Sequence, residues 1–153
     1  MIEMVKNPAY QVDVKHSVEL LKQLLHQVDE ATWLILAGNL SQFRDRALVE
    51  VTREAIPVAN ELYSASYGRV YIPLTGENKF GLKVEVLPLV GMRTYIQEVL
   101  LQRYGHLLFA AYDCFQNGAL LSDWFRPEFV EDLEQTGIIR VVQASPQACL
   151  VGV

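Results

Sequence analysis

The chain has 153 residues, of which 51% are hydrophobic and 20% are charged, and its formal net charge is −5. The apolar content excludes an intrinsically disordered chain, because disordered chains lack the apolar surface that offsets the entropy of ordering. The length is typical of one folding unit, so we predict a single domain over residues 1–153.

The sequence predicts a cytoplasmic protein. Its longest uninterrupted apolar runs, Trp33–Ala37 and Leu107–Tyr112, fall well short of the about 20 residues that a membrane-spanning helix needs. The N-terminal stretch has no apolar segment behind a positive start, so we expect no signal peptide. Cys114 and Cys149 are too few for a disulfide scaffold, and we expect both thiols to be reduced.

Apolar periodicity predicts two helices and a buried strand in the first part of the chain. Residues 17–28 carry leucines and valines at helical spacing. The run Trp33–Ala37 is apolar on both parities and is followed by Gly-Asn, as expected of a strand covered on both faces. Residues 44–63 repeat the helical spacing, and Pro57 should kink or divide that helix.

Two segments in the middle of the chain fit more than one structure. Residues 69–74 alternate as a strand does, and Pro73 favours a place near a sheet edge. Residues 76–88 fit either the return strand of a hairpin or a helix that begins after Thr75, and both interpretations stay open. Residues 94–104 fit a capped helix or a hairpin that turns at Tyr104-Gly105, and the hairpin is slightly favoured.

The last third of the chain carries the clearest turn signals. Leu107–Phe115 is an apolar strand, and Asn117-Gly118 is the residue pair typical of a tight hairpin turn. Counting outward from that pair places Phe115 opposite Leu120, Cys114 opposite Leu121 and Asp113 opposite Ser122. We expect a helix from Pro127 to Gly137 and a closing strand at Ile138–Val142.

Taken together, the elements predict an α+β fold. Two or three helices should pack on one face of a mostly antiparallel sheet of about four to six strands that contains hairpins. A doubly wound parallel sheet is not expected, because strands and helices do not alternate regularly along the chain.

No sequence motif identifies a reaction. Gly76 and Gly81 have the spacing of a phosphate-binding loop, but the lysine and hydroxyl residue that should follow are not in place. His16, His26 and His106 are too scattered to predict a metal site. We therefore expect no catalytic residues, no metal and no cofactor, and we expect that the protein is not an enzyme.

One carboxylate supports an alternative function. Asp113 interrupts an apolar strand, where it could hold the hairpin by bonding Ser122 or act as a general acid or base. The alternative to a binding module is therefore a small-ligand-binding protein or an unrecognised enzyme. Its pocket would surround Asp113 with Tyr112, Cys114 and Trp124.

Acidic residues are concentrated between residues 113 and 134. Asp113, Asp123, Glu128, Glu131, Asp132 and Glu134 stand there against Arg126 alone, so the segment carries six minus one, or −5, charges. Three of the acids share one face of the expected helix, and an aromatic pair precedes them. The pattern fits a solvated helix face or a docking surface, whose binding residues would be Asp123, Trp124, Glu128, Glu131 and Asp132.

The charge pattern also indicates the class of partner. Nucleic acid is not expected, because phosphates need clusters of Lys and Arg. We predict a small acidic protein-binding module that acts on a basic partner protein, by analogy with inhibitors or immunity-type antidotes of basic toxin enzymes. A homodimer is also expected, because Tyr71, Leu87 and Leu89 fall on the parity expected to be exposed and the mean hydropathy is +0.15.

Overall fold

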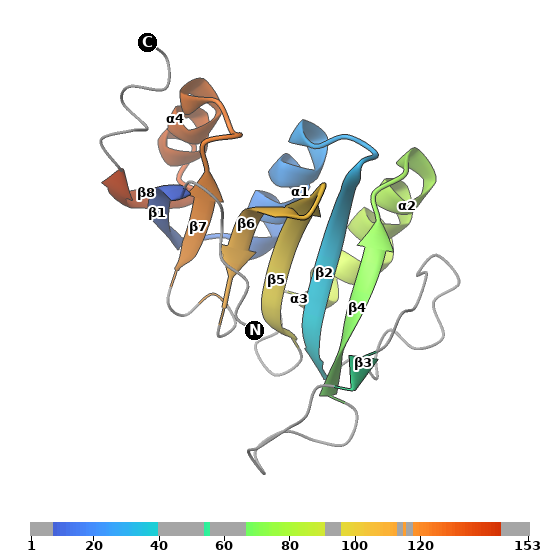
Figure 1. The fold of residues 1–153 in the computed structure, drawn as a ribbon. Coiled ribbons are helices and arrows are strands. Elements are labelled where there is room, and N and C mark those ends of the chain that lie inside the picture. Colours follow the sequence, from blue (N-terminus) through green and yellow to red (C-terminus); the bar gives the residue numbers. More distant parts are fainter. Residues whose placement is uncertain are drawn as a thin grey trace.

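The computed structural model describes residues 8–39, 54–55, 67–90, 96–112, 115 and 118–144. Eight strands form one sheet in the order β3-β4-β2-β5-β6-β7-β1-β8, and every pairing in it is antiparallel (Figure 1). The strands are β1 (Pro8–Val14), β2 (Thr32–Asn39), β3 (Glu54–Ala55), β4 (Tyr67–Pro73), β5 (Ile96–Arg103), β6 (His106–Ala111), β7 (Ala119–Ser122) and β8 (Ile139–Ala144).

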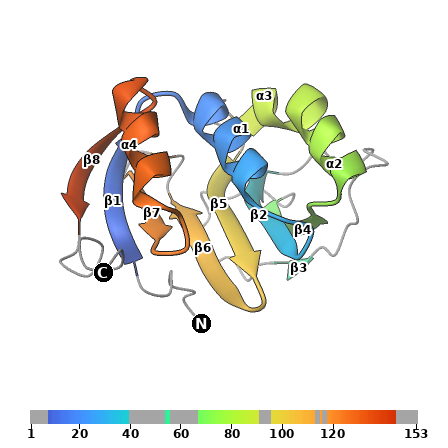
Figure 2. The same ribbon diagram turned by 90° about the horizontal axis from the view of Figure 1, so that it is seen from above.

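Three helical segments accompany the sheet. They are α1 (Ser17–Gln27), the continuous segment α2 (Gly76–Gly81), π-helical η1 (Leu82–Val86) and α3 (Leu87–Val90), and α4 (Pro127–Gln135). In Figure 2 these helices lie on one side of the curved sheet. The predicted α+β class is confirmed. The sheet has more strands than expected because β3 has two residues and because the bulge between Pro8 and Tyr10 breaks the alternation of β1.

The main core lies between the helices and the sheet. α1 buries four leucines, Leu20, Leu21, Leu24 and Leu25, as its spacing predicted. They share one cluster with Leu34 and Leu36 of β2 and with alternate residues of the neighbouring strands. The prediction that the run after Trp33 is buried on both faces is confirmed, since β2 lies between β4 and β5 and Ile35 is fully buried on the opposite side.

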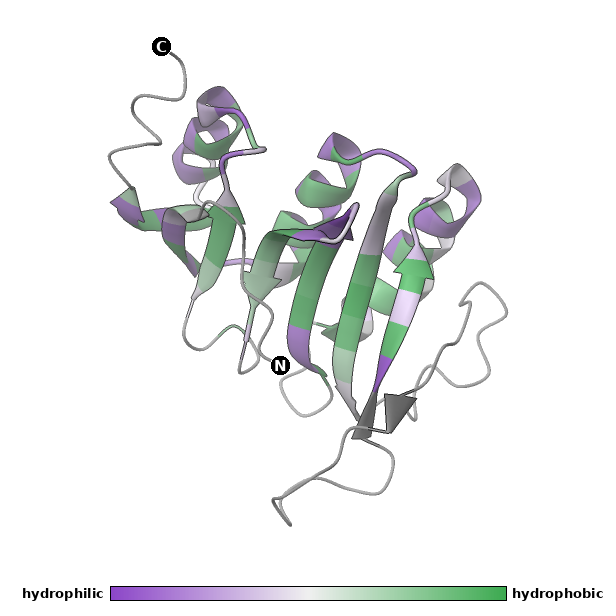
Figure 3. Ribbon diagram, viewed as in Figure 1, coloured by the Kyte–Doolittle hydropathy of each residue, from purple (hydrophilic) through white to green (hydrophobic). Residues whose placement is uncertain are grey.

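The side of the sheet that faces away from the helices has its own apolar cluster. It consists of Ile35, Leu100, Leu107 and Ala110, with Tyr71, Tyr112 and Leu120 packed against it. Figure 3 shows the resulting hydrophobic colour along the central strands. Alternate side chains in the middle of β2 and β5 therefore enter different clusters, which makes the middle of each of these strands apolar on both faces.

The open choice for residues 76–88 is resolved in favour of the helix. The Thr75 side chain accepts a hydrogen bond from the Asn78 N–H at 3.2 Å and caps α2. The wide turn of η1, in which the Leu87 N–H donates to the Leu82 carbonyl, lets both residues face the core. The prediction that Leu87 lies on an exposed face is therefore wrong, because its side chain is completely buried.

The two hairpins differ in how well the sequence predicted them. β5 and β6 turn at Tyr104-Gly105, whose φ angles are 50° and 80°, which confirms the favoured hairpin. The predicted β6–β7 register is wrong, because Phe109 pairs with Leu121 and Ala111 with Ala119. β6 ends at Ala111, so the connection to β7 is longer than a two-residue turn.

The remaining predictions have mixed outcomes. The helix from Pro127 to Gly137 is confirmed as α4, and the closing strand is confirmed as β8. The predicted helix over residues 44–63 is wrong at Glu54–Ala55, which pair with β4 as a strand. The rest of that prediction, with Pro57, lies outside the described residues, as do Asp113, Asn117, both cysteines and the side chain of Leu89.

Candidate functional site

The acidic segment folds as the turn after β7 followed by α4. Pro127 occupies the first turn of the helix, where its missing N–H costs no hydrogen bond. Val130 and Leu133 are buried against the sheet. Gly137, with φ of +79°, follows the last turn and redirects the chain into β8. Because one face of this short helix packs inward, its acidic residues point away from the core.

Four predicted binding residues form what we call the acidic surface: Asp123, Glu128, Glu131 and Asp132. All four are exposed. Within the part of the chain that the structure describes, none of their carboxylates accepts a hydrogen bond or joins an ion pair. These charges are therefore available to groups outside the described fold.

Trp124, the fifth predicted binding residue, packs against a neighbouring aromatic ring but stays partly exposed to solvent. Its ring meets the ring of Phe125 edge to face, with centroids 5.2 Å apart. Phe125 is buried and stacks on Phe129 at 5.6 Å. The backbone N–H of Trp124 donates to the Ser122 hydroxyl at 3.2 Å, and 38% of the residue stays exposed. An anchored and accessible indole beside acids is a suitable contact for a protein partner.

One acid of the segment is used inside the fold. The Glu134 carboxylate accepts the backbone N–H of Val141 in β8 at 2.8 Å, so it does not belong to the acidic surface. Sequence spacing gave no signal for this contact, since it depends on the turn between α4 and β8.

The alternative pocket is not assembled in the way the sequence suggested. Tyr112 follows the Ala111 end of β6 and packs on the side of the sheet away from the helices. Trp124 follows Ser122, at the other end of the β6–β7 pair, and contacts Phe125 of the helix-side core. The register separates the two aromatic residues along the strands and across the sheet, and Asp113 and Cys114 lie outside the described residues.

Other candidate chemistry has a structural explanation. Gly76 and Gly81 bound a helix, so their spacing does not form a phosphate-binding loop. Among the described residues no group of three or more His, Cys, Asp or Glu side chains is placed to hold a metal ion.

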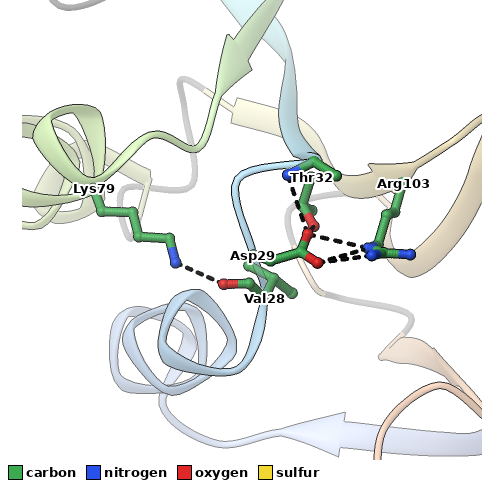
Figure 4. A network of polar contacts seen from close by, with 6 residues as sticks. Val28, Asp29, Thr32, Lys79 and Arg103 are labelled. Carbon is green, nitrogen blue, oxygen red and sulfur yellow. Dashed lines mark hydrogen bonds and ion pairs between the residues drawn. The ribbon is translucent and has the colours of Figure 1, made fainter.

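A polar network that the sequence did not predict joins three segments at one end of the sheet (Figure 4). Arg103 of β5 donates from Nε and Nη2 to the Asp29 carboxylate, with the closest contact at 2.7 Å. Asp29 also accepts from the Thr32 hydroxyl at 3.3 Å. Lys79 of α2 donates to the Val28 carbonyl at 2.6 Å, at the end of α1. These contacts fix the loop between α1 and β2, so we interpret them as structural.

The network predicts a measurable pH dependence. Hydrogen bonds from Arg103 lower the pKa of the Asp29 carboxyl from 3.8 to about 2. The stabilisation is therefore complete above the unfolded value and is lost as pH falls through about 2. Because the Asp29 side chain is 51% exposed, solvent screening limits its contribution to about 1 kcal/mol or less.

Replacing Arg103 is the direct test of this pKa. In Arg103→Ala the Asp29 pKa should rise toward 3.8, as measured by NMR titration of the side-chain carboxyl. Lys22→Ala, which breaks the exposed ion pair with Glu19, is the control and should leave the Asp29 pKa unchanged. A pKa that stays near 2 in Arg103→Ala would show that another group holds it.

Comparison with protein-family models, with curated proteins and with solved structures gave no match for this chain. In the described part of the chain, each helix is too short or too polar to cross a membrane.

Proposed function

We propose that the protein is a small binding module whose acidic surface docks on a basic partner protein. The observation that carries the proposal is the set of exposed, unpaired carboxylates beside Trp124. A carboxylate that is already paired with a cation inside the fold gains little from contact with a cationic partner protein. Here three carboxylates on α4 and that of Asp123 in the preceding turn have no ion-pair partner among the described residues, and Trp124 provides an aromatic contact beside Asp123.

Charge and shape act on different steps of such binding. From residue 118 to residue 137 there are five acids and one base, so the segment carries five minus one, or −4, charges. A concentrated negative field accelerates the encounter with a cationic surface and weakens with added salt. Trp124 would then supply the desolvated contact that slows dissociation. Inhibition of a basic enzyme in the cytoplasm is the finer form of this proposal.

Removing the same number of charges from α4 and from another part of the surface tests whether the acidic surface binds the partner. The α4 variant would carry Glu128→Gln, Glu131→Gln and Asp132→Asn. The control variant would carry Glu19→Gln, Glu30→Gln and Glu77→Gln. The control acids are also exposed, and both variants lose three negative charges. In affinity capture from a host lysate at low salt, basic proteins that elute at high salt should be recovered by the wild type and the control. The α4 variant should lose them.

The same capture can contradict the proposal. If the α4 variant recovers the same basic proteins as the control, binding reflects net charge and not the acidic surface. If the recovered partner is a basic enzyme, its activity should fall when the wild-type protein is added and should persist with the α4 variant.

We also propose that the chain forms a homodimer. Burial of Leu87 removes one residue that motivated this expectation, but Phe80 and Val84 are 73% and 61% exposed one helical turn apart on the outer side of α2 and η1. Exposed apolar pairs of this kind favour association. Light scattering at physiological salt should give twice the chain mass of 17.3 kDa, and Phe80→Ser should shift the mass toward the monomer. A monomeric wild type would contradict this proposal.

A further inference from the structure

β8 forms one edge of the sheet and pairs, among the described strands, with β1 alone (Figure 1). An edge strand presents backbone N–H and C=O groups that can pair with a strand of another molecule. Val142 of this strand is 52% exposed, so an apolar side chain accompanies those groups. An edge of this kind needs protection if the protein is not to associate through it.

The pairing with β1 shows which amide of β8 points outward. The Lys15 N–H donates to the Ile138 carbonyl at 2.8 Å, where the pairing begins. Hydrogen-bonded and non-hydrogen-bonded pairs alternate in an antiparallel ladder. Val12 and Val141 are three pairs further along, so theirs is a non-hydrogen-bonded pair. The Val141 N–H therefore points away from β1, toward the free edge.

A side chain of the same molecule accepts a hydrogen bond from that amide. Glu134, in the last turn of α4, accepts the Val141 N–H at 2.8 Å through Oε2. The turn that joins the two elements is fixed, because the Thr136 hydroxyl donates to the Asp132 carbonyl at 2.9 Å and the Ile138 N–H donates to the Leu133 carbonyl at 3.0 Å. The carboxylate is thereby held at the edge.

A second feature protects the same place. Gln11 pairs with Gln143 and Val12 with Val141, so Val142 is an extra residue opposite no partner. Such a bulge bends and twists an edge strand and makes continuous pairing with another strand harder. The cap and the bulge are adjacent in β8, which concentrates both at the middle of the exposed edge.

We propose that Glu134 is a guard residue that prevents β8 from pairing with β8 of a second copy of this chain. An incoming strand would have to accept a hydrogen bond from the Val141 N–H, which already donates to the Glu134 carboxylate. Two-fold pairing of identical antiparallel strands would also bring both Glu134 carboxylates to the same edge, where like charges repel. The guard is therefore most effective against the chain's own copy.

Glu134→Ala is the test, with Glu131→Ala as the charge-matched control on the same helix. In sedimentation velocity over a wide range of protein concentration, Glu134→Ala should reach twice the mass of the wild type at high concentration. Glu131→Ala should keep the wild-type mass, because among the described residues it is Glu134 and not Glu131 whose carboxylate is hydrogen-bonded to β8. Circular dichroism would verify that both variants are folded.

A second variant locates the association. Adding Val142→Lys to Glu134→Ala places a charge on the exposed edge and should restore the wild-type mass. The proposal is overturned if Glu134→Ala keeps the wild-type mass, or if the larger species persists in the double variant. Hydrogen exchange of the wild type is an independent measurement, since the Val141 amide should exchange slowly. Rapid exchange of this amide would also overturn the proposal.

Discussion

Phe109→Ala is expected to lower the free energy of unfolding by about 3–5 kcal/mol. Phe109 lies in β6, between β5 and β7, and is the bulkiest of the completely buried side chains in the described residues. Its removal loses the transfer free energy of the ring and leaves a cavity that packed neighbours can fill only partly. Urea denaturation followed by far-UV circular dichroism should show a much lower midpoint with a similar slope.

The matched control is Phe80→Ala, which removes the same ring from a residue that is 73% exposed. At a protein concentration low enough for the chain to be monomeric, its unfolding free energy should stay within about 0.5 kcal/mol of the wild type. Two variants that lose the same free energy would show that β6 does not contribute to the core as its burial indicates. The comparison is informative because the chemical change is identical and only the environment differs.

The elements that the sequence predicted correctly are those whose burial leaves a local pattern. α1 has one buried face, and its leucines recur with the period of the helix. β2 is covered on both sides, so its apolar run has no polar alternation and ends at a glycine. For both elements the residues that report the structure lie next to one another in the chain.

From the sequence, the secondary structure and strand register were left undecided or predicted wrongly where the structure depends on features that leave no periodic pattern in the chain. Residues 82–87 match strand and helix templates equally, because the exposed apolar residue Val84 stands between the buried residues Leu82 and Val86 and imitates the alternation of a strand. The β6–β7 register was counted from Asn117-Gly118, which assumed that the apolar run continues as a strand to Phe115. Instead β6 ends at Ala111, and Phe115 has a positive φ of 67°.

The contacts of the candidate site likewise include some that a local sequence pattern predicts and some that it does not. The acidic surface follows from helix spacing, so Glu128, Glu131 and Asp132 were predicted on one exposed face and are exposed in the structure. The contact of Arg103 with Asp29 joins residues 74 positions apart, and no local pattern reports it. The Glu134 contact with Val141 is short in sequence, but it needs the turn geometry and the edge position of β8.

Gly118→Ala is expected to cost about 2–4 kcal/mol of unfolding free energy. Its φ of +77° is a conformation that is unfavourable for residues with a Cβ by about 1–2 kcal/mol. A Cβ at this position would also lie 2.4 Å from the Val12 carbonyl oxygen, which is backbone and cannot rotate away. Because Val12 pairs with Ala119, relieving the contact would disturb the β1–β7 pairing. Denaturant unfolding of the variant measures the loss.

Gly105→Ala separates the two contributions to that cost. Gly105 has nearly the same φ, +80°, but nothing lies within 4 Å of the position that a Cβ would take. It should therefore lose only the conformational part, about 1–2 kcal/mol. The difference between the two variants measures the contact with Val12, and thus how closely β1 approaches the start of β7. Equal losses would mean that the chain relaxes at Gly118 and that the sheet tolerates a wider spacing between β1 and β7.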